Sequence, residues 1–404
     1  MRIIIPTIGT RGDIQPYIAL ALGLKVAGHE VMVVSHPSLR SLVDSYGVPF
    51  APMGPDIDLG KEAALIRGKS KNFMMGFLRV MKFSFRLLEE SHAELLELCK
   101  DQDLIIVSHS AAGSIEADLL NIPTVSATLM PMAIPANDPN TSVINKMIGK
   151  LAGGAMGLVM TRPLDQIRKR LGLPKMGQYG ITSPNLNLIP ISPVVDPPNP
   201  YWETRHQMTG FWFAPAPQNW QPAEDLAAFL QRGNPPVVIS LGAMAISGDD
   251  AMQAAQITVE AVKKTGIRAI IQGWDEPMSQ IELSENIFHG GSIPHDWLLE
   301  RSAAIVHHGG FGTTSSGLKA GIPSMAVPHI IDQFIWGQKL FDLGVGPKPL
   351  PRTKMTLEAF REALIDLTTN LQYQERAQEI GVKIRAEKGV ATAVSLIEES
   401  MVKK

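Results

Sequence analysis

Hydrophobic residues fall into short continuous runs along the chain, and segments with helical spacing separate these runs. Residues 2–6 form the first run, a loop at 7–13 follows, and the segment 14–27 has helical spacing that ends before Gly28. Further short runs lie at 31–35, 104–107, 124–127, 237–241, 267–272, 303–307 and 325–327. Short apolar runs that alternate with helices are typical of a parallel sheet covered on both faces. The pattern therefore predicts an α/β fold.

A proline-rich stretch interrupts this pattern near the middle of the chain. Eight prolines lie between positions 190 and 222. Proline fixes φ and disfavours helix in the residue before it, so the stretch indicates an extended, fairly stiff linker. We predict two α/β domains of similar size with a cleft between them, at 1–200 and 223–385, joined by a linker at 201–222. A last helical segment is expected at 386–404.

The composition narrows the class of protein. Of the 404 residues, 45% are hydrophobic and 19% charged, which excludes a disordered chain. The net charge of −2 gives no overall attraction for nucleic acid. Cys99 is the single cysteine, which excludes an intrachain disulfide and favours a reducing compartment. No apolar run reaches the ~18 residues that span a bilayer, so we expect a cytoplasmic protein and leave open a peripheral contact with the inner membrane surface.

The most informative segment is glycine-rich and follows an apolar run in the second half. It reads AIVHHGGFGTTSSG over residues 304–317. A strand that leads through glycines into a helix leaves backbone N–H groups at the helix start, where the helix dipole attracts anions. The segment lacks the lysine of a P-loop and the spacing G-x-G-x-x-G. We interpret it as a phosphate-binding turn, with a purely conformational role for the glycines as the alternative.

A second polar group follows the next apolar run. Asp332 and Gln333 lie directly after the run at 325–327. Open α/β sheets bind ligands at the carboxyl ends of their strands, and a carboxylate beside an amide suits neighbouring sugar hydroxyls. The alternative is that the pair only caps the helix that starts there.

Three motifs together resemble the inverting nucleotide-sugar glycosyltransferases of the GT-B fold, in glycosyltransferase family 1. They are GTRGDIQP at 9–16, HHGGFGTT at 307–314, and the segment 328–333 that ends in Asp332 and Gln333. The resemblance spans the chain and is closest to the sterol-type glucosyltransferases of bacteria and fungi and to the glycopeptide and macrolide glycosyltransferases. It implies two Rossmann-like domains facing across a cleft, the first for the acceptor and the second for the nucleotide sugar. It also implies that the helix at 386–404 packs back on the first domain.

The resemblance implies a role for each matched position. Asp13 matches the general base, and His308 matches the histidine that contacts the donor diphosphate, so these two are the expected catalytic residues. The other expected donor contacts are Arg11, Gly12, Gly242, Ala243, Ile293, His295, Gly310, Gly312, Thr313, Thr314, Asp332 and Gln333. Ser292 and Ser316 stand where plant members carry Trp and Glu, which leaves the choice between UDP and dTDP open.

The expected chemistry is a single displacement that inverts the anomeric configuration. Asp13 would take the proton of an acceptor hydroxyl, and His308 would stabilise the departing diphosphate. The alternative for Asp13 is a pairing with Arg11 or a cap on the following helix. We expect UDP-glucose as the donor and no cofactor. We also expect no metal, because the D-x-D triplets at 56–58 and 101–103 have the character of turns.

The acceptor side is expected in two segments rich in Met and Phe. Residues 61–86 carry seven basic residues and one acidic residue, Glu62, among many apolar ones. Flexible Met and Phe side chains suit a bulky apolar acceptor such as a sterol, a polyketide or another aglycone. The expected acceptor contacts are Phe73, Met74, Phe77, Met130 and Met132. The alternatives are a core-facing helix with a solvated basic face, and a contact of this segment with anionic lipid.

Other functions remain open at this point. A nucleotide-sugar epimerase would also need the phosphate-binding turn but would bind no acceptor. A non-catalytic nucleotide-sugar binding protein would have no use for Asp13. A nicotinamide oxidoreductase is disfavoured because the segment 9–12 lacks the third glycine of its fingerprint.

Overall fold

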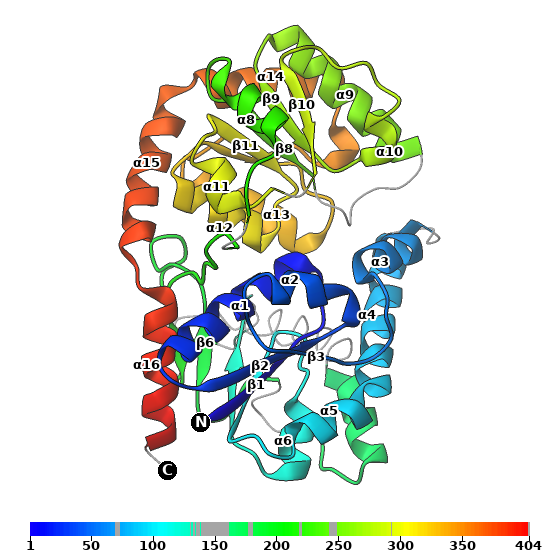
Figure 1. Cartoon of the computed structure of the whole chain (residues 1–404), viewed down its shortest axis with the longest axis vertical. Helices are drawn as coiled ribbons and strands as arrows, with labels where there is room; N and C mark the ends of the chain where they lie inside the picture. The colour runs from blue at the N-terminus through cyan, green and yellow to red at the C-terminus, as the bar shows by residue number, and fades with distance from the viewer. Residues whose placement is uncertain are drawn as a thin grey trace. The chain divides into compact units, whose positions relative to one another are not determined.

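The chain folds into two compact units. The computed structural model describes residues 1–68, 73–129, 131, 134, 138, 161–176, 181–217, 220–241, 249–291 and 293–402. The first unit comprises Met1–Ala214 together with Lys388–Lys404, and the second comprises Pro215–Glu387 (Figure 1). Each unit is built around its own parallel sheet.

A seven-stranded sheet forms the centre of the first unit. Its strands are β1 (Arg2–Pro6), β2 (Glu30–Ser35), β3 (Phe50–Pro52), β4 (Leu104–Val107), β5 (Thr124–Ala127), β6 (Asn187–Ile189) and β7 (His206–Met208). They lie in the order β3-β2-β1-β4-β5-β6-β7, and every neighbouring pair is parallel. The parallel α/β fold predicted from the apolar runs is therefore confirmed.

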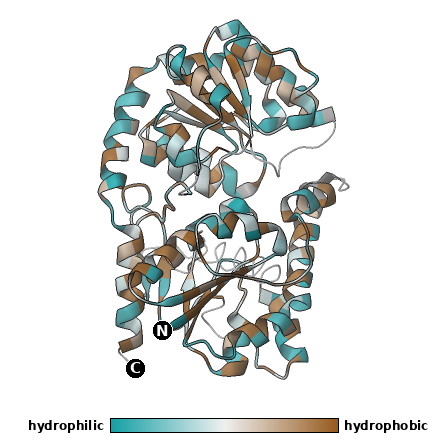
Figure 2. Cartoon of the chain, in the orientation of Figure 1, coloured by the Kyte–Doolittle hydropathy of each residue, from teal (hydrophilic) through white to brown (hydrophobic). Residues whose placement is uncertain are grey.

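Helices cover both faces of this sheet. They are α1 (Arg11–Val26), α2 (Arg40–Asp44), α3 (Leu59–Gly68), α4 (Phe73–Glu90), α5 (His92–Cys99), α6 (Ser114–Leu120) and α16 (Gly389–Val402). Successive strand residues point to opposite faces, so Ile3 and Ile5 pack with α1 and α16, whereas Ile4 and Ile105 pack with α4, α5 and α6. Figure 2 shows the central strands β1 and β2 as largely hydrophobic.

The last helix belongs to the first unit, and one strand lies inside the segment predicted as a linker. α16 packs against α1, where a Cβ atom on Gly23 would lie 2.3 Å from Val390 Cγ1. The division between the units falls after Ala214, inside the predicted linker at 201–222. β7 occupies the first part of that linker as the edge strand of the sheet, and an edge strand tolerates neighbouring prolines.

A five-stranded sheet forms the centre of the second unit. Its strands are β8 (Val237–Ser240), β9 (Ala269–Gln272), β10 (Ile287–Gly290), β11 (Ala304–His307) and β12 (Ser324–Ala326), all parallel in the order β10-β9-β8-β11-β12. Its helices are α8 (Glu224–Gln231), α9 (Asp249–Thr265), α10 (Asp275–Met278), α11 (His295–Leu299), α12 (Phe311–Ala320), α13 (Ile331–Asp342), α14 (Leu357–Thr369) and α15 (Leu371–Ala386).

Both sheets reverse their strand order at one point, and this decides where ligands can bind. The reversal lies between β1 and β4 in the first sheet and between β8 and β11 in the second. Open α/β sheets bind ligands outside the carboxyl ends of the strands at such a point. The loops after β1, β4, β8 and β11 are therefore the places to search for functional residues.

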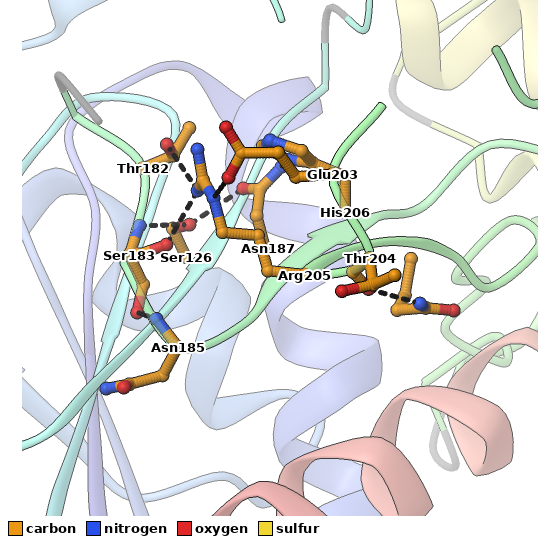
Figure 3. Close-up of polar contacts among 10 residues, drawn as sticks. Ser126, Thr182, Ser183, Asn185, Asn187, Glu203, Thr204, Arg205 and His206 are labelled. Carbon is orange, nitrogen blue, oxygen red and sulfur yellow. Dashed lines mark hydrogen bonds and ion pairs between the residues drawn. The ribbon is translucent and has the colours of Figure 1, made fainter. Parts of the chain in front are cut away.

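A buried polar network ties the two short strands β6 and β7 to the rest of the first sheet (Figure 3). Asn187 Oδ1 accepts hydrogen bonds from Ser126 Oγ at 2.7 Å and from Thr128 Oγ1 at 2.8 Å. Asn187 Nδ2 lies 3.1 Å from His206 Nδ1, and Ser183 N–H donates to Ser126 Oγ at 2.8 Å. Buried polar groups are stabilising only when they are paired, so this network holds β5, β6 and β7 in one register.

We expect the Asn187→Ala variant to lose about 2–4 kcal/mol of unfolding free energy, because it leaves Ser126, Thr128 and His206 without their buried partner. Urea unfolding followed by circular dichroism measures the loss. Asn185→Ala is the matched control, because Asn185 is exposed two residues away. Equal stability of the two variants would contradict the role assigned to the network.

Candidate active site

A carboxylate is held at the carboxyl end of β1. β1 ends at Pro6, and α1 begins at Arg11 with Thr10 as its N-cap residue. Asp13 Oδ2 accepts hydrogen bonds from Thr10 N at 2.7 Å and from Thr10 Oγ1 at 2.9 Å. The Asp13 side chain remains 38% exposed. The capping alternative is thus realised by Oδ2, and the second oxygen, Oδ1, is not part of that cap.

The close approach of the loop to this carboxylate requires glycine at position 9. A Cβ atom on Gly9 would lie 2.6 Å from Asp13 Cβ and 2.7 Å from Asp13 Oδ2. No real side chain fits at that distance, so a larger residue at this position would displace Asp13. Arg11 and Gly12 are exposed at the first turn of α1, and the space around Gly12 Cα is open.

A histidine from the loop after the neighbouring strand lies beside this carboxylate. His109 follows β4, and its Nε2 lies 3.7 Å from Asp13 Oδ1, which is an electrostatic contact beyond hydrogen-bond distance. The Tyr17 hydroxyl accepts from His109 N–H at 2.9 Å and lies 3.1 Å from His109 Nδ1. When that hydroxyl donates to Nδ1, the ring carries its proton on Nε2 and presents it to Asp13.

Burial shapes the charges of this group. Burial lowers the pKa of His109, and the charge of Asp13 opposes that shift. Burial raises the pKa of Tyr17, so its hydroxyl stays protonated and can donate. The surroundings therefore favour a neutral His109 imidazole near neutral pH. His109 was missed from the sequence, although it stands in a polar run, residues 108–110, directly after an apolar strand.

In the second unit, the predicted phosphate-binding segment forms a tight turn after β11. His307 is fully buried, and its Nδ1 accepts from Gly309 N–H at 3.0 Å. Burial, with smaller contributions from His308 and His295, lowers the pKa of His307 well below its usual value. The neutral His307 ring therefore serves to hold the turn. Gly309 has φ +90°, and a Cβ atom there would lie 2.6 Å from Gln333 O, so only glycine fits.

The turn places an imidazole ring at the start of α12. A Cβ atom on Gly310 would lie 2.3 Å from His308 Nε2, so the His308 ring lies directly against the N-cap residue of α12. The first N–H groups of a helix have no acceptor inside the helix and carry the positive end of its dipole. The arrangement can therefore hold an anion between α12 and His308.

Thr314, one of the predicted donor contacts, makes its own hydrogen bonds inside α12. Thr314 is fully buried, its N–H donates to Gly310 O at 2.9 Å, and its hydroxyl donates to the same carbonyl oxygen at 2.9 Å. Both donors of Thr314 are thus used inside the helix, which the sequence pattern could not reveal. Gly312 and Thr313 are half-buried in the first turn of α12, and their contact with an anion stays a prediction.

Asp332 and Gln333, the two polar residues that follow β12, differ in their surroundings. Gln333 Oε1 accepts from His329 N–H at 2.8 Å and from Ile330 N–H at 3.3 Å, and the residue is 4% exposed. This carbonyl oxygen closes the first turn of α13, as the capping alternative predicts, and leaves the amide NH₂ group as the part that can bind a ligand. Asp332 lies beside it, half-buried in the first turn of α13.

The loop after β10 borders the same edge of the sheet. Gln272 Nε2 donates to Gly291 O at 3.0 Å and fixes the loop. The side chain of Ile293 is buried in the core, so this residue can offer a ligand only its backbone. His295 begins α11, and the ion pair between Lys319 Nζ and Asp296 at 3.1 Å holds α11 beside α12.

Several predicted residues lie outside the described structure. These are Gly242, Ala243, Met130 and Met132, together with the side chains of Phe73 and Met74. Phe77 is half-buried on α4.

Among the described residues no group of three His, Cys, Asp or Glu side chains is placed to hold a metal ion. Of the two D-x-D triplets, Asp58 Oδ1 caps α3 by accepting from Gly60 N–H at 3.0 Å, and Asp103 accepts from Arg2 N–H at 2.7 Å.

The chain is thus a two-unit α/β protein with a turn that can hold an anion in one unit and a fixed, partly exposed carboxylate in the other. The sequence model of the glycosyltransferase family 28 N-terminal domain matches residues 3–127. The model of the erythromycin biosynthesis protein CIII-like C-terminal domain matches residues 267–397.

Solved structures with the same architecture extend over the whole chain. The glycosyltransferase VinC in complex with dTDP superposes with a TM-score of 0.73, 20% identity and 100% coverage of both chains. The Streptomyces sp. SF2575 glycosyltransferase SsfS6, complexed with thymidine diphosphate, gives a TM-score of 0.70, 21% identity and 99% coverage of both chains. At this level of identity the likeness shows the fold, which is GT-B.

Curated relatives point to the same family. The sterol 3-beta-glucosyltransferase of Aspergillus clavatus is 33% identical over 98% of this chain and 29% of its own length. That of Komagataella phaffii is 31% identical over 99% of this chain and 34% of its own length. The chain thus spans about a third of the curated relatives it matches. Together the two sequence models, these relatives and the solved structures support a GT-B glycosyltransferase of the family-1 type.

Proposed function

We propose that the protein transfers a hexose, with inversion, from a nucleoside diphosphate sugar to a hydroxyl of a lipophilic acceptor. The observation that carries the proposal is Asp13, whose Oδ2 is fixed by Thr10 while the side chain stays 38% exposed. A carboxylate held in this way is suited to take a proton from an alcohol. The donor proposed is UDP-glucose, and the acceptor class is sterols and comparable aglycones, because the relatives named above are sterol 3-beta-glucosyltransferases.

The donor is assigned to the second unit. Its diphosphate would lie at the start of α12 against His308, where the helix N–H groups and the imidazole can donate to phosphate oxygens. The amide of Gln333 and the carboxylate of Asp332 would bind the sugar hydroxyls. The backbone around Ile293 and the ring of His295 would border the nucleobase.

The acceptor is assigned to the first unit. Asp13 would accept the proton of the attacking hydroxyl, and His109 would orient the carboxylate through its Nε2–H. Direct attack on the anomeric carbon from the side opposite the diphosphate inverts its configuration, so an α-linked donor yields a β-glycoside. The positive end of α12 and His308 would stabilise the charge of the leaving group, so the proposal includes no metal and no cofactor beyond the donor. We place this reaction in the reducing cytoplasm, because the single cysteine, Cys99, is buried and free.

The direct test is a transfer assay in EDTA with UDP-glucose and dTDP-glucose against a panel of sterol, flavonoid and macrolide alcohols. Mass spectrometry should detect a glycoside with at least one acceptor, and NMR should show it to be β-linked. Turnover of the donor alone into another nucleotide sugar would indicate an epimerase instead. Donor binding without any turnover over the whole panel would favour a binding protein, and activity only after addition of a divalent metal would overturn the metal-free mechanism.

A further inference from the structure

Three exposed apolar side chains gather on one helical hairpin of the first unit. α3 and α4 pack side by side (Figure 1). Leu65 on α3 is 50% exposed, and Met75 and Leu78 on α4 are 46% and 41% exposed. The second half of α4 is anchored in the core through Phe85 and Leu88. The hairpin therefore presents large apolar side chains at one end while its other end is firmly attached.

The same hairpin carries a strong positive charge. Residues 59–90, which span both helices, contain seven Lys and Arg residues against Glu62, Glu89 and Glu90, although the whole chain has a net charge of −2. Lys61, Arg79, Lys82 and Arg86 are exposed on the described part, where Lys61 lies 3.8 Å from Asp58 and Arg86 lies 3.1 Å from Glu90. Arg79, Lys82 and Arg86 follow Leu78 at helical spacing, so the cations continue the exposed face that the apolar side chains begin.

We propose that this face, formed by Leu65, Met75, Leu78, Arg79 and Lys82, docks on a bilayer that contains anionic phospholipids. Charge complementarity decides the partner, because a cluster of cations beside exposed apolar side chains matches anionic headgroups above an acyl layer. The docking is peripheral, since none of the helices among the described residues is long and apolar enough to cross a bilayer. The binding of lipid does not depend on the proposed sugar transfer.

Such docking would serve a lipophilic acceptor. A sterol or comparable aglycone dissolves in the bilayer far better than in water, so an enzyme on the surface meets a higher local concentration of it. The exposed apolar side chains would enter the headgroup region, and the cations would pair with phosphate and carboxylate groups there.

The test is flotation of the full chain with vesicles of phosphatidylcholine alone and of phosphatidylcholine mixed with phosphatidylglycerol, without donor or acceptor. We expect binding to the mixed vesicles only, and its loss at high salt. The Arg79→Gln/Lys82→Gln variant should bind about 25-fold more weakly, since each cation near an anionic surface contributes about a fivefold factor. The Leu65→Ser/Leu78→Ser variant should bind roughly tenfold more weakly.

Matched controls come from the second unit. Lys263→Gln/Lys264→Gln on α9 removes two cations, and Leu371→Ser/Val382→Ser on α15 removes two exposed apolar side chains, 68% and 61% exposed. Both controls should float like the parent chain. Equal binding to neutral vesicles, or unchanged binding of both hairpin variants, would overturn the proposal. Loss of transfer to a detergent-dissolved acceptor in those variants would assign the face to the acceptor instead, and would equally overturn it.

Discussion

The Asp13→Asn variant should lose about 10²–10⁴-fold in kcat, the range that a general base contributes. The amide keeps the shape of the side chain and an oxygen that can accept from Thr10 N–H, so the loop and α1 stay in place. What disappears is the basic oxygen that faces His109. Because the donor is assigned to the other unit, its dissociation constant should stay within about twofold of the parent value.

The measurement separates catalysis from folding and from donor binding. Initial rates with a saturating acceptor give kcat, calorimetric titration with UDP-glucose gives the dissociation constant, and thermal unfolding reports stability. Asp44→Asn is the matched control, because Asp44 is exposed at the end of α2 and lies outside the proposed site. A kcat of the Asp13 variant within tenfold of the parent would remove Asp13 as the base.

The central strands were predictable from sequence for a physical reason. β1, β4 and β5 lie inside a parallel sheet that is covered on both faces, so most of their residues are apolar, and their predicted bounds equal the observed ones. β3, β6 and β7 have three residues each and were not predicted. β6 begins with Asn187, which is compatible with a buried strand only because the side chains of Ser126, Thr128 and His206 satisfy it.

The candidate site was predictable where one local motif carries the chemistry. The loop with Asp13 and the turn around His308 are each continuous in sequence, and a glycine pattern marks both of them. His109 was not predictable in this way, because 96 positions separate it from Asp13 and only the pairing of β1 with β4 brings the two together. The rule that ligands bind at the reversal of strand order could have pointed to the loop after β4.

Motif matching alone does not show in which direction each matched side chain points. Thr313 and Thr314 are equivalent in the sequence pattern, yet successive residues of a helix point about 100° apart. Thr314 therefore turns into the unit, where its hydroxyl bonds the preceding turn, and Thr313 stays half-buried. The direction of each side chain can be deduced from a sequence only after the first residue of the helix is known, and this helix begins at Phe311.

The Gly310→Ala variant should weaken binding of UDP and dTDP by about 10–100-fold without unfolding the protein. Gly310 has φ −69°, which alanine adopts freely, so the backbone is not strained. The added Cβ atom would lie 2.3 Å from His308 Nε2 and would push the imidazole away from the start of α12. The expected factor is that of a lost hydrogen bond to a charged group, about 1.5–3 kcal/mol.

Calorimetric titration with each nucleotide checks this expectation, and thermal unfolding should show little change. Gly233→Ala is the matched control in the same unit, because its Cβ atom would meet only the flexible Arg268 side chain, at ordinary distances of 3.4 Å and more. The same factor should appear for UDP and for dTDP, since the affected contact is to the diphosphate that both share. A selective loss for one nucleotide would place the His308 ring against the nucleoside, and unchanged affinity for both would exclude His308 from the donor site.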